Sequence, residues 1–144
     1  MRLNFPFIGN FEVNLNKDLP NFAYNIHNIF NHLSIEIIVL VYHLMLHEQK
    51  ILFIGKSEKS ISELLEIMRI LTYPLIWNNT FISVLSEELV RYLQCMVPFM
   101  MGIEENLLYI AKEHLECQDS VFIINISKNT IDFNKKRINK KSLK

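Results

Sequence analysis

Three short, almost uninterrupted apolar runs constrain the fold of this 144-residue chain more than any other feature of its sequence. They are Ile51–Ile54, Phe99–Ile103 and Val121–Ile126. A strand that is apolar on both sides must be covered on both sides, which is typical of the interior strands of a parallel sheet. Because segments with helical periodicity separate these runs, the sequence predicts an α/β fold: a central, mostly parallel sheet with helices on both faces, arranged as a three-layer sandwich.

Five segments are predicted to be helical from their caps and their apolar periodicity. The first runs from Asn21 to about His32, and the second has Ser34 at its N-cap position. The others run from Ser60 to about Thr72, from Ser86 to Cys95 and from Asn106 to Leu115. In the second helix Glu36, His43 and His47 share one stripe, and the apolar residues elsewhere predict that this helix is mostly enclosed. In the third helix Ser60 and Glu63 fit a capping box.

The other expected strands are shorter or more polar. Phe11, Val13 and Leu15 alternate with polar residues, which is typical of a half-buried strand. Phe81–Val84 is predicted to be a strand, and Thr130–Phe133 is predicted to pair as a hairpin with the third apolar run.

Charge is unevenly distributed along the chain. Up to Ser127 it holds fourteen acidic residues and eight lysines or arginines, a net charge of −6, whereas the rest carries seven cations against Asp132, a net charge of +6. We expect a connector strand region in residues 1–16, the α/β domain in residues 17–133 and a basic, disordered tail in residues 134–144. The acidic body lacks the clustered cations that nucleic-acid binding needs. The tail could contact acidic lipid, but a domain boundary within a lysine-rich protein is the favoured interpretation.

Cysteine usage and segment lengths predict a cytoplasmic protein. Cys95 and Cys117 match no metal or redox spacing, so both are expected to pack as small hydrophobes in a reducing compartment. The most apolar stretch, Ile35–Leu46, falls short of the ~20 residues that a membrane span needs. No signal peptide is expected from the mixed residues after Arg2. At most, peripheral association with vesicle or endomembrane surfaces is expected.

Gly55, Lys56 and Ser57 follow the first apolar run and precede a helix, which is the order of a phosphate-binding loop. Such a loop needs another glycine five residues before Gly55, and Lys50 stands there. These three residues are therefore predicted to be a strand end with a solvated lysine, and no nucleotide cofactor is expected.

His43 and His47 lie four residues apart and could share a metal-binding face. Leu44 follows His43, so the His-Glu order of zinc proteases is absent, and a catalytic zinc would need a third protein ligand. Exposed helix histidines without a metal are therefore predicted. The sequence also lacks a nucleophile elbow, a paired-carboxylate signature and a cofactor fingerprint, so no catalytic residue or cofactor is expected.

Trp77 is the single tryptophan, and it lies in a connection between a helix and a strand, followed by two asparagines. An aromatic residue among polar connection residues is a typical interface anchor. Trp77, Asn78, Asn79 and Phe81 are therefore candidate partner-binding residues. The alternative is that Trp77 fills the end of the sheet and holds the connection in place, since tryptophans are highly buried on average.

From about Leu33 to Phe133 the sequence resembles the central segment of DENN domains, called cDENN. Four blocks match in order: LMLHEQKILFIG (Leu44–Gly55), ILTYPLIWNNTFISVLSEEL (Ile70–Leu89), VPFMMGI (Val97–Ile103) and VFIINISKNTI (Val121–Ile131). The sequence departs from the family pattern at Ser83, where a proline is usual, and at Asn125 and Ser127, where aspartates are common.

The resemblance implies a guanine-nucleotide exchange factor for a Rab-type small GTPase in membrane trafficking, and therefore a GTPase regulator without catalytic chemistry of its own. The four candidate residues around Trp77 would then contact the GTPase. A complete module resembles an upstream longin-like lobe, this central segment and a downstream helical segment, and both flanking parts are expected to be missing. The alternative is a DENN-like scaffold or tethering domain that binds a partner without exchange. An α/β hydrolase or nucleotide enzyme is disfavoured by the absent motifs.

Overall fold

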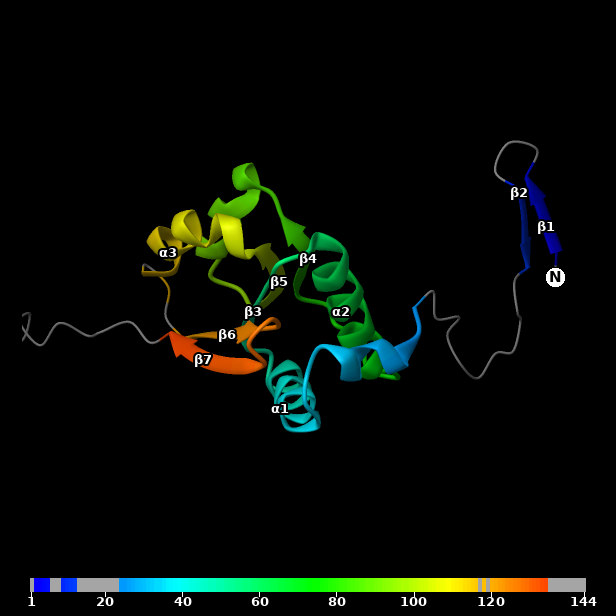
Figure 1. The fold of residues 1–144 in the computed structure, drawn as a ribbon, viewed down its shortest axis with the longest axis horizontal. Coiled ribbons are helices and arrows are strands. Elements are labelled where there is room, and N and C mark those ends of the chain that lie inside the picture. The colour runs from blue at the N-terminus through cyan, green and yellow to red at the C-terminus, as the bar shows by residue number, and fades with distance from the viewer. Residues whose placement is uncertain (1, 6–8, 13–23, 117, 119, 135–144) are drawn as a thin grey trace, which may run out of the picture.

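The computed structural model describes residues 2–5, 9–12, 24–116, 118 and 120–134. Its centre is a five-stranded sheet in the order β4-β5-β3-β6-β7 (Figure 1). The strands are β3 (Lys50–Gly55), β4 (Thr80–Leu85), β5 (Phe99–Glu104), β6 (Val121–Asn125) and β7 (Thr130–Asn134). Strands β3 to β6 run parallel and β7 is antiparallel to β6, so the predicted mostly parallel sheet and its closing hairpin are confirmed.

Helical elements cover both faces of this sheet, as predicted. The 3₁₀ helix η1 (Ile26–Asn31), α1 (Ile35–Leu46) and α2 (Glu58–Leu71) pack on one face. On the other face lie the 3₁₀ helices η2 (Glu87–Gln94) and η3 (Glu105–Leu107) and helix α3 (Leu108–Glu116). Alternate residues of β3 serve the two layers: Phe53 packs under α1 and α2, and Leu52 packs under η2 and α3.

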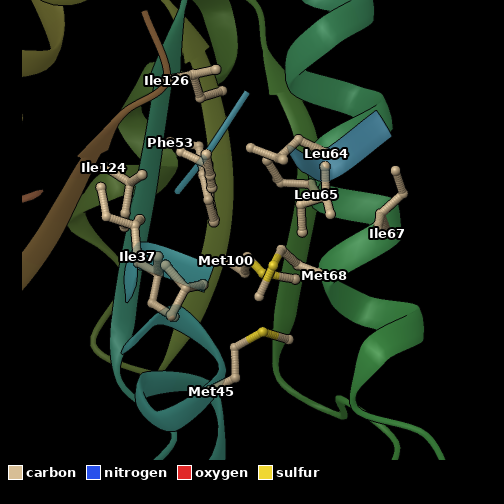
Figure 2. Close-up of a cluster of buried hydrophobic side chains, with 14 of the residues drawn as sticks. Ile37, Met45, Phe53, Leu64, Leu65, Ile67, Met68, Met100, Ile124 and Ile126 are labelled. Atoms are coloured by element: carbon tan, nitrogen blue, oxygen red, sulfur yellow. The ribbon is translucent and has the colours of Figure 1, made fainter. Parts of the chain in front are cut away.

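Helix α2 lies close to the sheet because two strand residues beneath it have no side chain. Ile61 of α2 is fully buried over Gly55 of β3 and Gly102 of β5. A Cβ on Gly55 would lie 2.8 Å from Ile61 Cγ1, and one on Gly102 would lie 2.3 Å from Ile61 Cγ2. Figure 2 shows the cluster that results further along α2, where Leu64 and Met68 point towards the sheet.

Strand β4 contributes to the same close contact. Its register against β5 shifts between Ile82 and Leu85, which marks an irregularity over Ser83 and Val84. A Cβ on Gly102 would also lie 2.3 Å from the Ser83 carbonyl oxygen. Bulges at sheet edges are tolerated because only one side of the strand is paired.

The start of α2 differs from its prediction. The helix begins at Glu58 with Ser57 at the N-cap position, so the capping box at Ser60 is wrong. Glu63 is engaged elsewhere, because its Oε1 accepts a 2.5 Å hydrogen bond from Asn28 Nδ2 of η1.

Two further helices are shorter or tighter than predicted. The first begins with Asn25, whose side chain accepts the His27 N–H at 3.1 Å, whereas Asn21 lies outside the described residues. The segment after Ser86 is a 3₁₀ helix, and its buried residues Val90 and Leu93 lie three apart, which places them on one face of such a helix.

Helix α1 is less enclosed than predicted. Ile37 and Val41 are buried against the sheet, but Ile35 and Val39 are 63% and 60% exposed. The prediction of a mostly enclosed helix is therefore wrong for one face, because the sheet and α2 cover only the opposite side. Its N-terminus is closed by the β6–β7 turn, where Asn129 Oδ1 accepts the Ser34 N–H at 2.9 Å.

The N-terminal strand region forms a second sheet of its own. Strands β1 (Arg2–Phe5) and β2 (Gly9–Glu12) pair antiparallel. The strand predicted at Phe11 is confirmed, whereas Val13 and Leu15 lie outside the described residues. So do residues 135–144 of the expected tail.

We expect the two glycines under Ile61 to differ in their tolerance of alanine. Gly102→Ala should lower the free energy of unfolding by more than ~3 kcal/mol, because its Cβ meets the Ser83 backbone as well as Ile61. Gly55→Ala should cost about 1–2 kcal/mol, because its close contacts are side chains that can shift. Urea unfolding of both variants tests this, and equal losses would show that the Ser83 contact does not matter.

Candidate functional site

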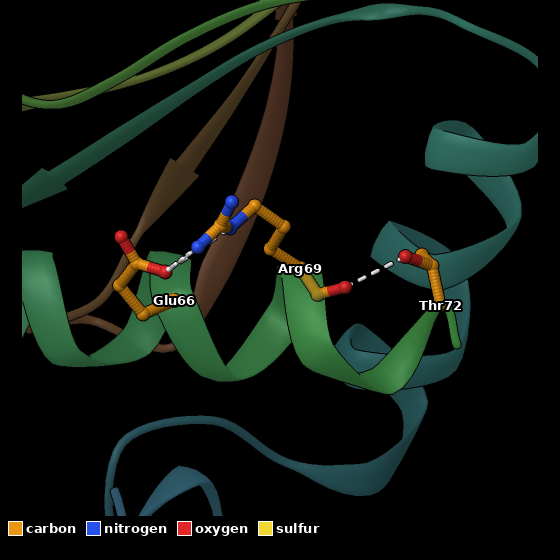
Figure 3. Close-up of polar contacts among 3 residues, drawn as sticks. All are labelled: Glu66, Arg69 and Thr72. Carbon is orange, nitrogen blue, oxygen red and sulfur yellow. Dashed lines mark hydrogen bonds and ion pairs between the residues drawn. The ribbon is translucent and has the colours of Figure 1, made fainter. Parts of the chain in front are cut away.

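The connection between α2 and β4 begins with a buried polar residue. Thr72 is 4% exposed, and its Oγ1 donates a 2.7 Å hydrogen bond to the Arg69 carbonyl (Figure 3). The Leu75 N–H in turn donates to the Thr72 carbonyl at 2.9 Å. This local network fixes a turn that leaves Leu75 and Ile76 on the surface, 58% and 78% exposed.

Trp77 anchors the other end of this connection. Its ring is half-buried against the α1–α2 side of the core, and its Nε1–H donates to the Thr80 carbonyl at 3.3 Å. This geometry agrees with the alternative reading, in which Trp77 holds the connection in place. The same side chain also lines two surface cavities.

The end of α1 faces this connection and has an unusual residue at its terminus. The Gln49 N–H donates to the Leu44 carbonyl and the Glu48 N–H to the Met45 carbonyl, each at 3.0 Å. This pair of bonds is a Schellman motif, in which the residue at the position of Glu48 is left-handed and usually glycine. Glu48 has φ of 50°, so a glutamate occupies a conformation that favours glycine.

The two helix ends and the connection to β4 line an open cavity of about 340 Å³, which we call the Trp77 cavity. Its walls combine apolar side chains with polar groups from both helix ends and from the connection. The apolar residues are Met45, Leu46, Leu75, Ile76 and Trp77, and the polar ones are Glu48, Thr72, Asn78 and Asn79. A second cavity of about 170 Å³ lies on the other side of the exposed Leu75–Ile76 pair, where Arg69 and Tyr73 contribute.

Three of the four candidate residues come together in this cavity. Trp77, Asn78 and Asn79 line it, whereas Phe81 lies on β4 outside the lining. The Phe81 ring packs against the core and under the Arg69 guanidinium, 5.1 Å from ring centroid to Cζ. Arg69 is also paired with Glu66 at 2.7 Å (Figure 3).

Sequence reasoning missed the contribution of α1 to this site. Leu46 and Glu48 belong to a segment predicted only as a helix end. Helices commonly end in a left-handed glycine or asparagine, and the sequence has neither directly after Leu46. This absence was the available signal that another residue type adopts the left-handed conformation there.

The glycine-lysine-serine sequence is a strand end, as predicted. Gly55 is needed for packing, since Ile61 and Ile126 fill the space where its Cβ would lie. Ser57 is the N-cap residue of α2, and Lys56 is exposed.

The two helix histidines are exposed, as predicted. Their ring centroids lie 4.2 Å apart, and His47 Nδ1 donates to the His43 carbonyl at 2.9 Å. Within the described part of the chain, no three His, Cys, Asp or Glu residues are grouped so that they could hold a metal ion.

Cys95 has the environment of a packing residue. Burial raises the pKa of its thiol, which disfavours the reactive thiolate, although nearby Lys50 acts in the opposite direction. Cys117 lies outside the described residues. None of the described helices has the length and apolar character needed to span a bilayer.

Comparison with known proteins identifies the family of this fold. A family model described as the DENN (AEX-3) domain matches residues 9–129. The chain belongs to the DENN domain family. The matched residues include α1, α2 and the connection to β4, so the Trp77 cavity lies within the DENN segment.

Individual relatives are distant in sequence. The chain is 26% identical over 98 residues to DENN domain-containing protein 2D of Mus musculus, covering 68% of this chain and 20% of that protein. It is 25% identical over 108 residues to DENN domain-containing protein 1B of Mus musculus, covering 75% and 14%. It is 28% identical over 109 residues to Elicitor of plant defense protein 1 of Fusarium odoratissimum, covering 75% and 11%. The chain therefore spans a fifth or less of the length of these curated relatives.

Glu48→Gly should stabilise this DENN segment. Glycine adopts φ of 50° without the Cβ clash, and this gain exceeds its larger unfolded-state entropy, for an expected net increase of about 0.5–1 kcal/mol in the free energy of unfolding. Lys112→Gly, in exposed helical backbone of α3, should instead cost ~1 kcal/mol. Urea unfolding measures both, and a loss of stability in the Glu48 variant would contradict the argument.

Proposed function

We propose that this DENN domain acts within a guanine-nucleotide exchange factor for a Rab-type small GTPase in vesicle trafficking. The observation that carries the proposal is the DENN match over residues 9–129, since DENN domains generally are Rab exchange factors. The chain spans a fifth or less of its relatives, so the activity is proposed for a complete module with a longin-like lobe and a downstream helical segment. Its place of action would be the cytoplasmic side of vesicle or endomembrane surfaces.

Exchange of this kind depends on binding energy and breaks no covalent bond. The factor binds the nucleotide-free GTPase more tightly than the GDP-bound form, and by linkage it weakens GDP binding by the same ratio. Structurally, this requires remodelling of the GTPase switch loops that the γ-phosphate and Mg²⁺ otherwise order. The residues that matter are therefore those that provide a binding surface.

The connection between α2 and β4 supports such a surface. Leu75 and Ile76 are exposed apolar side chains with a cavity on each side, and Asn78 and Asn79 add polar groups at the larger one. A few anchors of this kind dominate most protein interfaces. A stable interface buries ~800 Å² on each partner. This connection is one part of such an area, and the longin-like lobe would share the rest.

We expect residues 1–144 alone to release GDP from Rab GTPases weakly or not at all. Release should rise when the longin-like lobe is restored in cis or added in trans, because the shared interface is then complete. Loss of a fluorescent GDP analogue from a panel of Rab proteins measures this, with EDTA-stimulated release as the loading control. Full-rate release by residues 1–144 would contradict the shared interface. Tight binding of a Rab by the restored module without GDP release would favour the tethering alternative.

Ile76→Asp should weaken binding of the restored module to nucleotide-free Rab at least ~tenfold, because a charge replaces an apolar anchor. Ile76 is 78% exposed, so the fold should be unaffected. Tyr109→Asp is a matched control, since Tyr109 is also exposed but lies on α3 in the opposite layer. Affinity that is equal in both variants would exclude the α2–β4 connection as a contact.

A further inference from the structure

The Trp77 cavity has a single charged residue in its lining, and that residue is acidic. In the part of the chain that the structure describes, the Glu48 carboxylate has no hydrogen bond or ion pair. The neighbouring cavity differs, because its charged residue Arg69 is already paired with Glu66 at 2.7 Å. The Trp77 cavity therefore has an uncompensated negative charge beside apolar walls.

The backbone conformation of Glu48 is a second observation that points to a role for its carboxylate. A left-handed residue at a helix end favours glycine, and a side chain there costs ~1 kcal/mol or more. Glu48 adopts φ of 50° within the Schellman motif that ends α1. Residues kept in unfavourable backbone conformations often serve function, so the inference runs from the observed conformation to a role for the carboxylate.

The other residues that line the cavity favour one type of cationic group over another. Leu46, Leu75 and Trp77 offer apolar surface along which the stem of a long cationic side chain can lie. The indole ring attracts a cation to its face. Asn78 and Asn79 provide amide oxygens that accept several N–H groups. A planar guanidinium matches this combination better than an ammonium group, because it stacks on aromatic faces and donates in several directions.

We propose that the Trp77 cavity binds an arginine side chain of the GTPase partner, with its guanidinium between Glu48 and the Trp77 ring and its stem along Leu46 and Leu75. The inference rests on the proposed function for the identity of the partner. The choice of an arginine rests on the Glu48 charge together with the apolar, aromatic and amide groups that line the cavity. Such an arginine would be the anchor that fixes the α2–β4 connection on the GTPase surface.

The single tryptophan of the chain provides the assay. Residues 1–144 are titrated with N-acetyl-arginine methylamide while Trp77 fluorescence is followed at constant ionic strength. The matched neutral probe is N-acetyl-citrulline methylamide, which has the same shape without the charge. N-acetyl-lysine methylamide tests the ammonium alternative. The variants are Glu48→Gln and, as a control on the opposite layer, the exposed Glu88→Gln.

The arginine probe should bind at least about fivefold more tightly than the citrulline probe, which is the size of an exposed cation–π and ion-pair preference. It should also bind more tightly than the lysine probe, because a guanidinium stacks on the indole and donates in several directions. Glu48→Gln should reduce the ratio of arginine to citrulline affinity to about one, and Glu88→Gln should leave it unchanged. Equal affinity of the arginine and citrulline probes, or an unchanged ratio in Glu48→Gln, would overturn the proposal. Equal affinity of the lysine probe would overturn the choice of arginine. The titration contains no GTPase, so its failure is distinct from a failure of the exchange assay.

Discussion

The position of α2 depends on the contact of Ile61 with two strand positions that lack side chains. Gly55 and Gly102 lie on neighbouring strands, and together they let a β-branched side chain touch the sheet backbone. Packed interiors do not deform smoothly, so a helix seated this closely has one position along and across the strands. Further along α2, buried Leu64, Leu65 and Met68 pack in the same core, and the Thr72 hydroxyl closes the C-terminal end of the helix.

The candidate site lies where helices α1 and α2 end. Helix α1 ends in a Schellman motif at Glu48, and α2 ends at a buried threonine hydroxyl. Both ends satisfy backbone groups locally, as helix termini must. Because Met45 and Met68 pack in one cluster, the two helices are fixed relative to each other (Figure 2). The cavity beside Trp77 therefore lies where two helix ends that pack on the same core come together.

The sequence predicted the sheet well because continuous apolar runs have few other uses in a chain of this length. It failed at Ser60, where the capping-box pattern was present but Glu63 bonded to η1 instead. The sequence prediction also placed Phe81 beside Trp77, because the two residues are close in the chain. Closeness in the chain does not reveal that β4 directs the Phe81 ring to the core and away from the cavity lining. Glu48 was missed for a related reason: its place in the cavity depends on the approach of two helices, which periodicity does not encode.

Proteins that act by binding use ordinary residue types, so their sites have no chemical signature in sequence. Such a site can be marked by a residue whose exposure or backbone conformation is unfavourable for folding. Ile76 exposes most of its apolar surface, and Glu48 keeps a carboxylate in a backbone conformation suited to glycine. Both costs fall on one cavity at the junction of two well-packed helices. One substitution could remove either cost without disturbing the core, since neither side chain supports it. Their coincidence supports the proposed recognition of a partner at this cavity.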